Sequence, residues 1–156
     1  MPSHTETRIL PYSREQMFDL VMDIRRYPEF LPWCVGARVN RETRGMVEAD
    51  VLIGYRIFRE KFSSTVHIRR PSEIEVEYRK GPMRELHNTW VFRDAGPGKC
   101  EINFDISFTM QNKFLGKLVE QFFHQALAKM IDAFEKRAEN LYGPPAPLPP
   151  MRNGRR

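Results

Sequence analysis

The sequence has little cysteine, and its apolar residues never form a long uninterrupted run. The 156 residues include two cysteines, Cys34 and Cys100. Cys100 lies on the apolar phase of an alternating segment, which favours a buried free thiol over a disulfide and fits a reducing, intracellular compartment. No apolar stretch approaches the roughly 18 residues that a membrane-spanning helix needs, and no apolar signal-peptide core is found at the N-terminus. We therefore do not expect a disulfide scaffold or an integral membrane protein.

Motifs of catalysis and metal binding are also missing. His4, His67, His87 and His124 show no metal-ligand spacing with one another or with the cysteines. The sequence contains no nucleophile elbow, and the Gly-Pro-Gly-Lys segment at 96–99 is too short for a phosphate-binding loop. We therefore expect no metal, no catalytic residue and no catalytic cofactor.

Positive charge is not concentrated in the body of the chain. The formal net charge is +5, and three of these five excess charges are supplied by Arg152, Arg155 and Arg156 in the last five residues. Elsewhere, acidic residues are interspersed among the basic ones. Because binding to nucleic-acid phosphates needs a concentrated basic face, a nucleic acid is not expected as the partner.

A long amphipathic helix is the strongest pattern that the sequence does contain. Apolar residues recur every three or four positions between Asn112 and Tyr142, which predicts one helix of about 45 Å with a broad apolar face. Gly143, followed by two prolines, is a strong stop signal. The central positions of that face are Leu115, Leu118, Phe122, Ala126, Met130, Phe134 and Ala138.

Strict alternation of apolar and polar residues from Cys100 to Met110 predicts a half-buried strand directly before this helix. Ser13 begins a short helix with Gln16 three residues later, a capping-box pattern, and two prolines allow only a bent turn near residues 27–34. Alternation bounded by turn residues predicts six further strands, near residues 5–10, 35–44, 47–53, 58–68, 74–78 and 86–92.

The predicted fold class is therefore α+β, with seven antiparallel strands in a curved sheet around the long C-terminal helix. We expect one domain over residues 1–143 and a disordered, Pro-rich, basic tail over residues 144–156. A curved sheet around a rod tends to leave a gap, and apolar gaps are the usual setting of ligand pockets.

Three motifs together resemble the coenzyme Q-binding START-domain proteins of the polyketide-cyclase-like, helix-grip superfamily. They are Tyr-Pro-Glu-Phe-Leu-Pro-Trp-Cys at 27–34, Leu-His-Asn-Thr-Trp-Val-Phe at 86–92, and the helix end with Ala-Phe at 133–134, Arg-Ala at 137–138 and Leu-Tyr-Gly at 141–143. The resemblance covers roughly residues 3 to 143. It implies a helix-grip (START-like) fold, in agreement with the strand and helix patterns.

The resemblance also implies a function. We expect an apolar tunnel that binds a polyprenyl quinone (ubiquinone), in a carrier or chaperone supporting quinone synthesis and respiratory electron transport without catalysis. Such a protein would be cytoplasmic and peripheral to the inner face of the respiratory membrane. Two alternatives stay open: a toxin of the same family that blocks association of ribosomal subunits, with the ribosome as its partner, and a polyketide cyclase-like enzyme.

The candidate ligand-binding residues are those expected to point inward or to close the open end of the core. Phe30, Leu31 and Trp33 lie between or beside prolines and suit a semi-rigid lid. The expected lining of the tunnel, which ordinary core packing would equally explain, consists of Phe62, Val66, Asn88, Trp90, Phe104, Phe108, Phe122, Met130 and Phe134.

Two polar residues share the phase of apolar neighbours. Glu60 and Asn88 are candidates for contact with the quinone head group, although a bulge or a hydrogen bond to a neighbouring backbone would also satisfy them. The connection at 79–84 places a methionine, Met83, among cations that include Lys80 and Arg84. An exposed apolar tip with a basic rim predicts transient docking on an anionic membrane.

Overall fold

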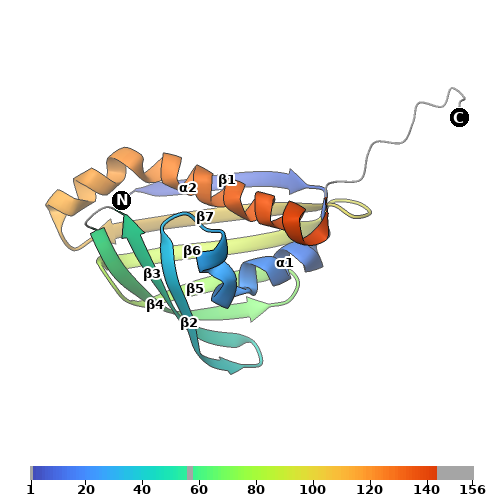
Figure 1. Ribbon diagram of the computed structural model, residues 1–156, viewed down its shortest axis with the longest axis horizontal. Coiled ribbons are helices and arrows are strands. Elements are labelled where there is room, and N and C mark those ends of the chain that lie inside the picture. Colours follow the sequence, from blue (N-terminus) through green and yellow to red (C-terminus); the bar gives the residue numbers. More distant parts are fainter. Residues whose placement is uncertain (1, 56–57, 144–156) are drawn as a thin grey trace, which may run out of the picture.

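One antiparallel sheet of seven strands forms the frame of the molecule (Figure 1). The computed structural model describes residues 2–55 and 58–143, so the predicted tail at 144–156 lies outside the described residues. The strand order is β1-β7-β6-β5-β4-β3-β2. The strands are β1 (Ser3–Leu10), β2 (Cys34–Thr43), β3 (Met46–Tyr55), β4 (Phe58–Arg69), β5 (Glu73–Lys80), β6 (Met83–Asp94) and β7 (Cys100–Met110).

Three helical elements complete the fold: α1 (Arg14–Met22), the 3-10 helix η1 (Ile24–Glu29) and α2 (Lys113–Tyr142). Helix α2 runs across one face of the curved sheet, and α1 lies near its carboxyl end (Figure 1). The predicted seven-stranded curved antiparallel sheet around a long C-terminal helix is thus confirmed. None of the helices in the described part of the chain is long and apolar enough to cross a membrane.

The ends of the helices follow local sequence signals. Ser13 caps α1, because its side chain accepts a hydrogen bond from Gln16 N while the Gln16 side chain accepts one from Ser13 N. Helix α2 ends at Tyr142, where Gly143 takes a φ of 90° and donates to the Glu139 carbonyl at 2.9 Å. Only glycine adopts that backbone conformation at little cost, so the helix ends where the sequence predicts.

The two halves of α2 pack on different parts of the sheet. Its carboxyl half places Ile131, Phe134 and Ala138 in the main core, together with residues of α1, β1, β6 and β7. Its amino half packs through Phe123 onto a smaller cluster with Met83, Phe108 and Met110. A second glycine lets this half come close: a Cβ on Gly116 would lie 3.3 Å from the Met110 Cβ.

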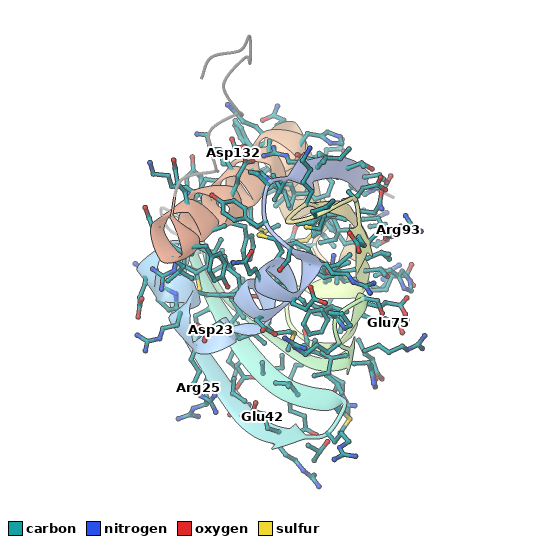
Figure 2. The ribbon with its side chains drawn as sticks, turned by 90° about the vertical axis from the view of Figure 1, so that its right-hand side faces the viewer. Asp23, Arg25, Glu42, Glu75, Arg93 and Asp132 are labelled. Carbon is teal, nitrogen blue, oxygen red and sulfur yellow. The ribbon has the colours of Figure 1, made fainter. Side chains whose placement is uncertain are left out.

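The outer face of the sheet is charged. Glu75 and Arg93 point away from α2 in Figure 2, whereas Arg25 of η1 and Glu42 of β2 lie side by side at the sheet edge, with 3.3 Å between their charged atoms. Such exposed pairs contribute little to stability. The stabilising contacts of the fold therefore lie between α2 and the inner face.

Candidate functional site

The interface between the carboxyl half of α2 and the sheet encloses little free space. The cavity enclosed there has a volume of about 10 Å³ and is lined by Trp90, Phe104, Phe134 and neighbouring side chains. That volume is near the minimum for a single water molecule, whereas small-molecule pockets typically enclose about 300–1,000 Å³. No room for a ligand is found at this cavity, because Trp90, Phe104 and Phe134, which were predicted to line a tunnel, pack against one another there.

The aromatic side chains of the interface make this packing specific. The Trp90 ring centroid lies 4.7 Å from that of Phe104 and 5.4 Å from that of Phe134, both in edge-to-face geometry. These are favoured arrangements for aromatic pairs. The predicted inward position is confirmed for the buried Val66, Trp90, Phe104, Phe108 and Phe134, and Phe62 and Met130 are half-buried against the same clusters.

Phe122 was predicted to point inward, and this is wrong: half of its surface is exposed (50%). The inward position is taken by Phe123, which is 7% exposed and stacks edge-to-face on Phe108 at 4.7 Å. The apolar face of α2 is wider than the sheet surface beneath its amino half. Phe114, Leu118 and Phe122, spaced four residues apart, therefore remain exposed.

The predicted lid packs on the core and on α2 and does not border an entrance. Phe30 packs edge-to-face on Phe134 at 5.4 Å, and the Arg137 guanidinium lies 5.0 Å from the Phe30 ring centre. Leu31 packs against the same core. Trp33, which has a positive φ of 65°, turns aside and meets Tyr55 at 5.7 Å.

An ion-pair bridge holds this lid to the helix. The Glu29 carboxylate accepts hydrogen bonds from Arg26 at 2.8 Å and from Arg137 of α2 at 2.9 Å. These two guanidinium groups, Arg26 foremost, hold the pKa of the Glu29 carboxyl below its ordinary value.

The two polar candidates do not meet in a pocket. The Asn88 side-chain amide donates to the backbone carbonyl of Asp105 at 2.8 Å, so a neighbouring strand satisfies it. Glu60 is half-buried on β4. A head-group contact through Asn88 is therefore not supported, because its amide is used within the sheet.

The predicted membrane-docking tip is also corrected. Met83 is only 9% exposed and packs with Phe108, Met110 and Phe123, while Lys80 and Arg84 are exposed. The pairing of β6 with β7 shifts register between Met83 and Glu85, which turns Met83 from the outer to the inner face. The β5–β6 turn therefore exposes the cations Lys80 and Arg84 but no apolar side chain of Met83.

Sequence reasoning missed a polar ladder between β1 and α2. His4, Glu6 and Arg8 lie on the same strand phase as the buried Leu10 and so face the helix. Arg8 bonds Glu6 at 2.5 Å and reaches two carboxylates of α2, Asp132 at 2.8 Å and Glu135 at 2.9 Å. Burial opposes the Arg8 charge, but hydrogen bonds to Asp132 and Glu6 outweigh it and raise the Arg8 pKa.

The ladder continues through an imidazole pair. His4 Nδ1 lies 2.9 Å from His124 Nδ1, and His4 Nε2 lies 2.9 Å from Glu6 Oε1. One ring must donate and the other accept, so the pair links edge strand β1 to α2. Within residues 2–55 and 58–143, no cluster of three or more potential ligands could hold a metal ion.

Both cysteines are buried free thiols, as predicted for Cys100. Desolvation raises the pKa of Cys100 to about 11 and raises that of Cys34. The thiolate fraction of Cys100 at pH 8 is then about one in a thousand.

We expect iodoacetamide at pH 8 to leave Cys100 unmodified in the native protein and to modify it in urea, as read by mass spectrometry. Rapid labelling of the native protein would contradict this burial.

The molecule gathers cations at one end, which we call the cationic end. There the β5–β6 turn meets the end of β7, because the backbone and side-chain amides of Gln111 donate to the carbonyls of Pro82 at 3.3 Å and of Met83 at 3.2 Å. In residues 58–62, 79–85 and 110–118, cations outnumber acids seven to two. Arg79 pairs with Glu77 at 3.9 Å, and within the described part of the chain the other six form no ion pair: Arg59, Lys61, Lys80, Arg84, Lys113 and Lys117.

The curved seven-stranded antiparallel sheet and the long helix α2 across it define a helix-grip protein of the START type. Residues 10–135 match the family described as polyketide cyclase / dehydrase and lipid transport. The chain belongs to this family, and the predicted family resemblance is confirmed.

Curated relatives match the chain over nine-tenths of its length. It is 34% identical over 144 residues to a ribosome association toxin of Pseudomonas aeruginosa, covering 92% of this chain and 100% of the relative. It is 39% identical over 146 residues to a ribosome association toxin of Rickettsia prowazekii, covering 90% and 99%.

Solved structures share the fold. An 18 kDa protein from Caulobacter crescentus is 33% identical with a TM-score of 0.74, covering 92% of this chain and 100% of the other. The Zhui aromatase/cyclase of a Streptomyces species has a TM-score of 0.75 but only 11% identity, covering 89% and 94%. Its likeness shows the fold alone.

These relatives overturn the predicted quinone carrier. The coenzyme Q-binding relative, from Xenopus laevis, is 28% identical and matches over only 59% of its own length, whereas the ribosome association toxins match more closely and almost completely. The expectation of a ubiquinone ligand rested on the tunnel and on this branch of the family. The comparisons favour the alternative expectation, the ribosome-directed branch.

Proposed function

We propose that this protein binds a ribosomal subunit and hinders the association of subunits. The observation that carries the proposal is the similarity over at least 90% of the chain, at 34% and 39% identity, to two ribosome association toxins. The small cavity beneath the carboxyl half of α2 supports it, because a volume of about 10 Å³ has no room for a prenyl chain.

The proposed action is binding rather than catalysis. A protein that covers part of the surface where two subunits meet prevents their joining by mass action alone, without a reaction step. The protein would accordingly work where ribosomes are, and not at the inner face of the respiratory membrane. The unpaired cations at the cationic end suit a polyanionic partner.

The test is the ribosome profile of cells that express the chain. We expect the peak of intact ribosomes to shrink on a sucrose gradient and the peaks of free subunits to grow, with the protein cosedimenting with one subunit. Cells carrying the same gene with an early stop codon are the control. An unchanged profile at high expression, with the protein remaining at the top of the gradient, would rule the proposal out.

A further inference from the structure

We propose that the cationic end and the exposed stripe Phe114–Leu118–Phe122 form one docking surface for ribosomal RNA. This inference rests on the proposed function and names the partner's chemistry and the part of this molecule that meets it. It is carried by two features that the fold leaves without internal partners: unpaired cations on three chain segments, and an unburied apolar row on α2.

The two features lie at the same end of the molecule. The amino half of α2 lies at the end where β3 and β7 finish (Figure 1). The hydrogen bonds from Gln111 to the carbonyls of Pro82 and Met83 join the β5–β6 turn to the start of α2. Lys80 pairs in register with Ser63 of β4, so cations of the turn, of β4 and of α2 border one another.

The charge distribution fits RNA phosphates. Elsewhere in the described chain, some cations are used in ion pairs, such as Arg70 with Asp19 at 2.9 Å and Arg93 with Glu101 at 3.5 Å, whereas others, such as Arg41 on the β2–β3 hairpin, are not. Lys80, Arg84 and Lys113 form no such pair and are exposed. Exposed cations without acidic neighbours attract a polyanion and release its counterions on binding, which makes the binding salt-dependent.

The exposed stripe supplies the second requirement, a flat apolar contact. Phe114 is 80% exposed, and Leu118 and Phe122 are each 50% exposed. Aromatic side chains that project among cations stack on unpaired bases, and such stacking tolerates many sequences.

An anionic lipid surface fits this helix less well. Beyond Phe122, the same side of α2 continues three and seven residues later with Gln125 and Lys129, both exposed. A helix that lies in a lipid interface needs its apolar row to continue there. Amide and ammonium groups in line with the stripe instead suit a partner that offers hydrogen-bond acceptors and phosphates.

The experiment compares binding of purified wild-type and variant proteins to purified ribosomal subunits and to protein-free RNA extracted from them. Lys80→Glu with Arg84→Glu is expected to weaken both about tenfold or more and to reduce the salt dependence. Phe114→Ala is expected to weaken them about tenfold. The matched controls, Arg41→Glu with Arg44→Glu on the exposed β2–β3 hairpin and Ile9→Ala on exposed β1, should leave binding unchanged.

Each outcome decides between defined alternatives, with circular dichroism confirming that every variant is folded. If the wild type binds no subunit, the proposed function itself fails. If it binds and the Lys80/Arg84 variant binds equally well, the function stands and this surface is wrong. If the variants lose binding to phosphatidylglycerol vesicles while subunit binding is unchanged, the surface takes lipid and the RNA assignment is overturned.

Discussion

Replacing Phe134 with alanine is expected to lower the free energy of unfolding by about 3–5 kcal/mol. Phe134 is 3% exposed and lies between three aromatic rings: Tyr27 at 5.6 Å, Phe30 at 5.4 Å and Trp90 at 5.4 Å. Tyr27 lies in η1, Phe30 follows η1 directly and Trp90 lies in β6, so Phe134 joins α2 to all three. Since domains of this size have about 5–15 kcal/mol of stability in total, the loss is a large share of it.

Urea unfolding followed by circular dichroism measures this loss. Phe122→Ala on the same helix is the matched control, because half of that side chain is already in water. We expect it to cost less than about 1 kcal/mol. Equal losses for the two variants would mean that the face of α2 that meets the sheet is assigned wrongly.

The second large effect is expected for Arg8→Met. This substitution leaves Glu6, Asp132 and Glu135 close together without the cation that joins them. Because the Arg8 side chain is 24% exposed, the pair is only partly shielded from water, and we expect a loss of about 2 kcal/mol, below the range for fully buried ion pairs.

Arg25→Met is the matched control for Arg8→Met in the same urea unfolding measurement. Arg25 and Glu42 also form an ion pair, at 3.3 Å, but both side chains are well exposed at 61% and 58%. Exposed pairs contribute about 0–1 kcal/mol, so this variant should unfold at nearly the wild-type urea concentration. If Arg8→Met were as mild as Arg25→Met, the ladder would not hold β1 to α2.

The spacing of apolar residues, together with the capping and turn residues, was enough to predict the sheet and the helices. The alternation from Cys100 to Met110 matches β7 residue for residue, and the helix predicted to end at Tyr142 does so. The capping box at Ser13 formed as expected. These features are determined by residues a few positions apart, which the sequence places side by side.

Two site predictions were wrong because they depended on contacts between distant segments. Met83 changes face through a register shift between β6 and β7, and nothing in the local alternation marks it. Phe122 lies on a regular helical stripe, but how far the sheet extends beneath that stripe depends on the whole fold. The spacing of apolar residues shows which face of a helix or strand is apolar, but not how much of that face the rest of the protein buries.

The polar ladder between β1 and α2 and the packing around Phe134 could not be predicted for the same reason: both depend on contacts between distant segments. Arg8 and Glu135 are 127 positions apart, so only the packing of α2 against β1 brings them together. Whether a curved sheet leaves a tunnel depends on how rings such as Trp90 and Phe134 interlock. Composition gives the volume available for a core but not its arrangement.

The function that we propose is binding to a ribosomal subunit without a lipid ligand. Reassociation of purified ribosomal subunits, followed by light scattering, tests this directly when the added protein has been stripped of lipid by unfolding, organic extraction and refolding. We expect the stripped protein to slow reassociation as strongly as the untreated protein. Inhibition that disappears on stripping and returns only with the extracted lipid would contradict it.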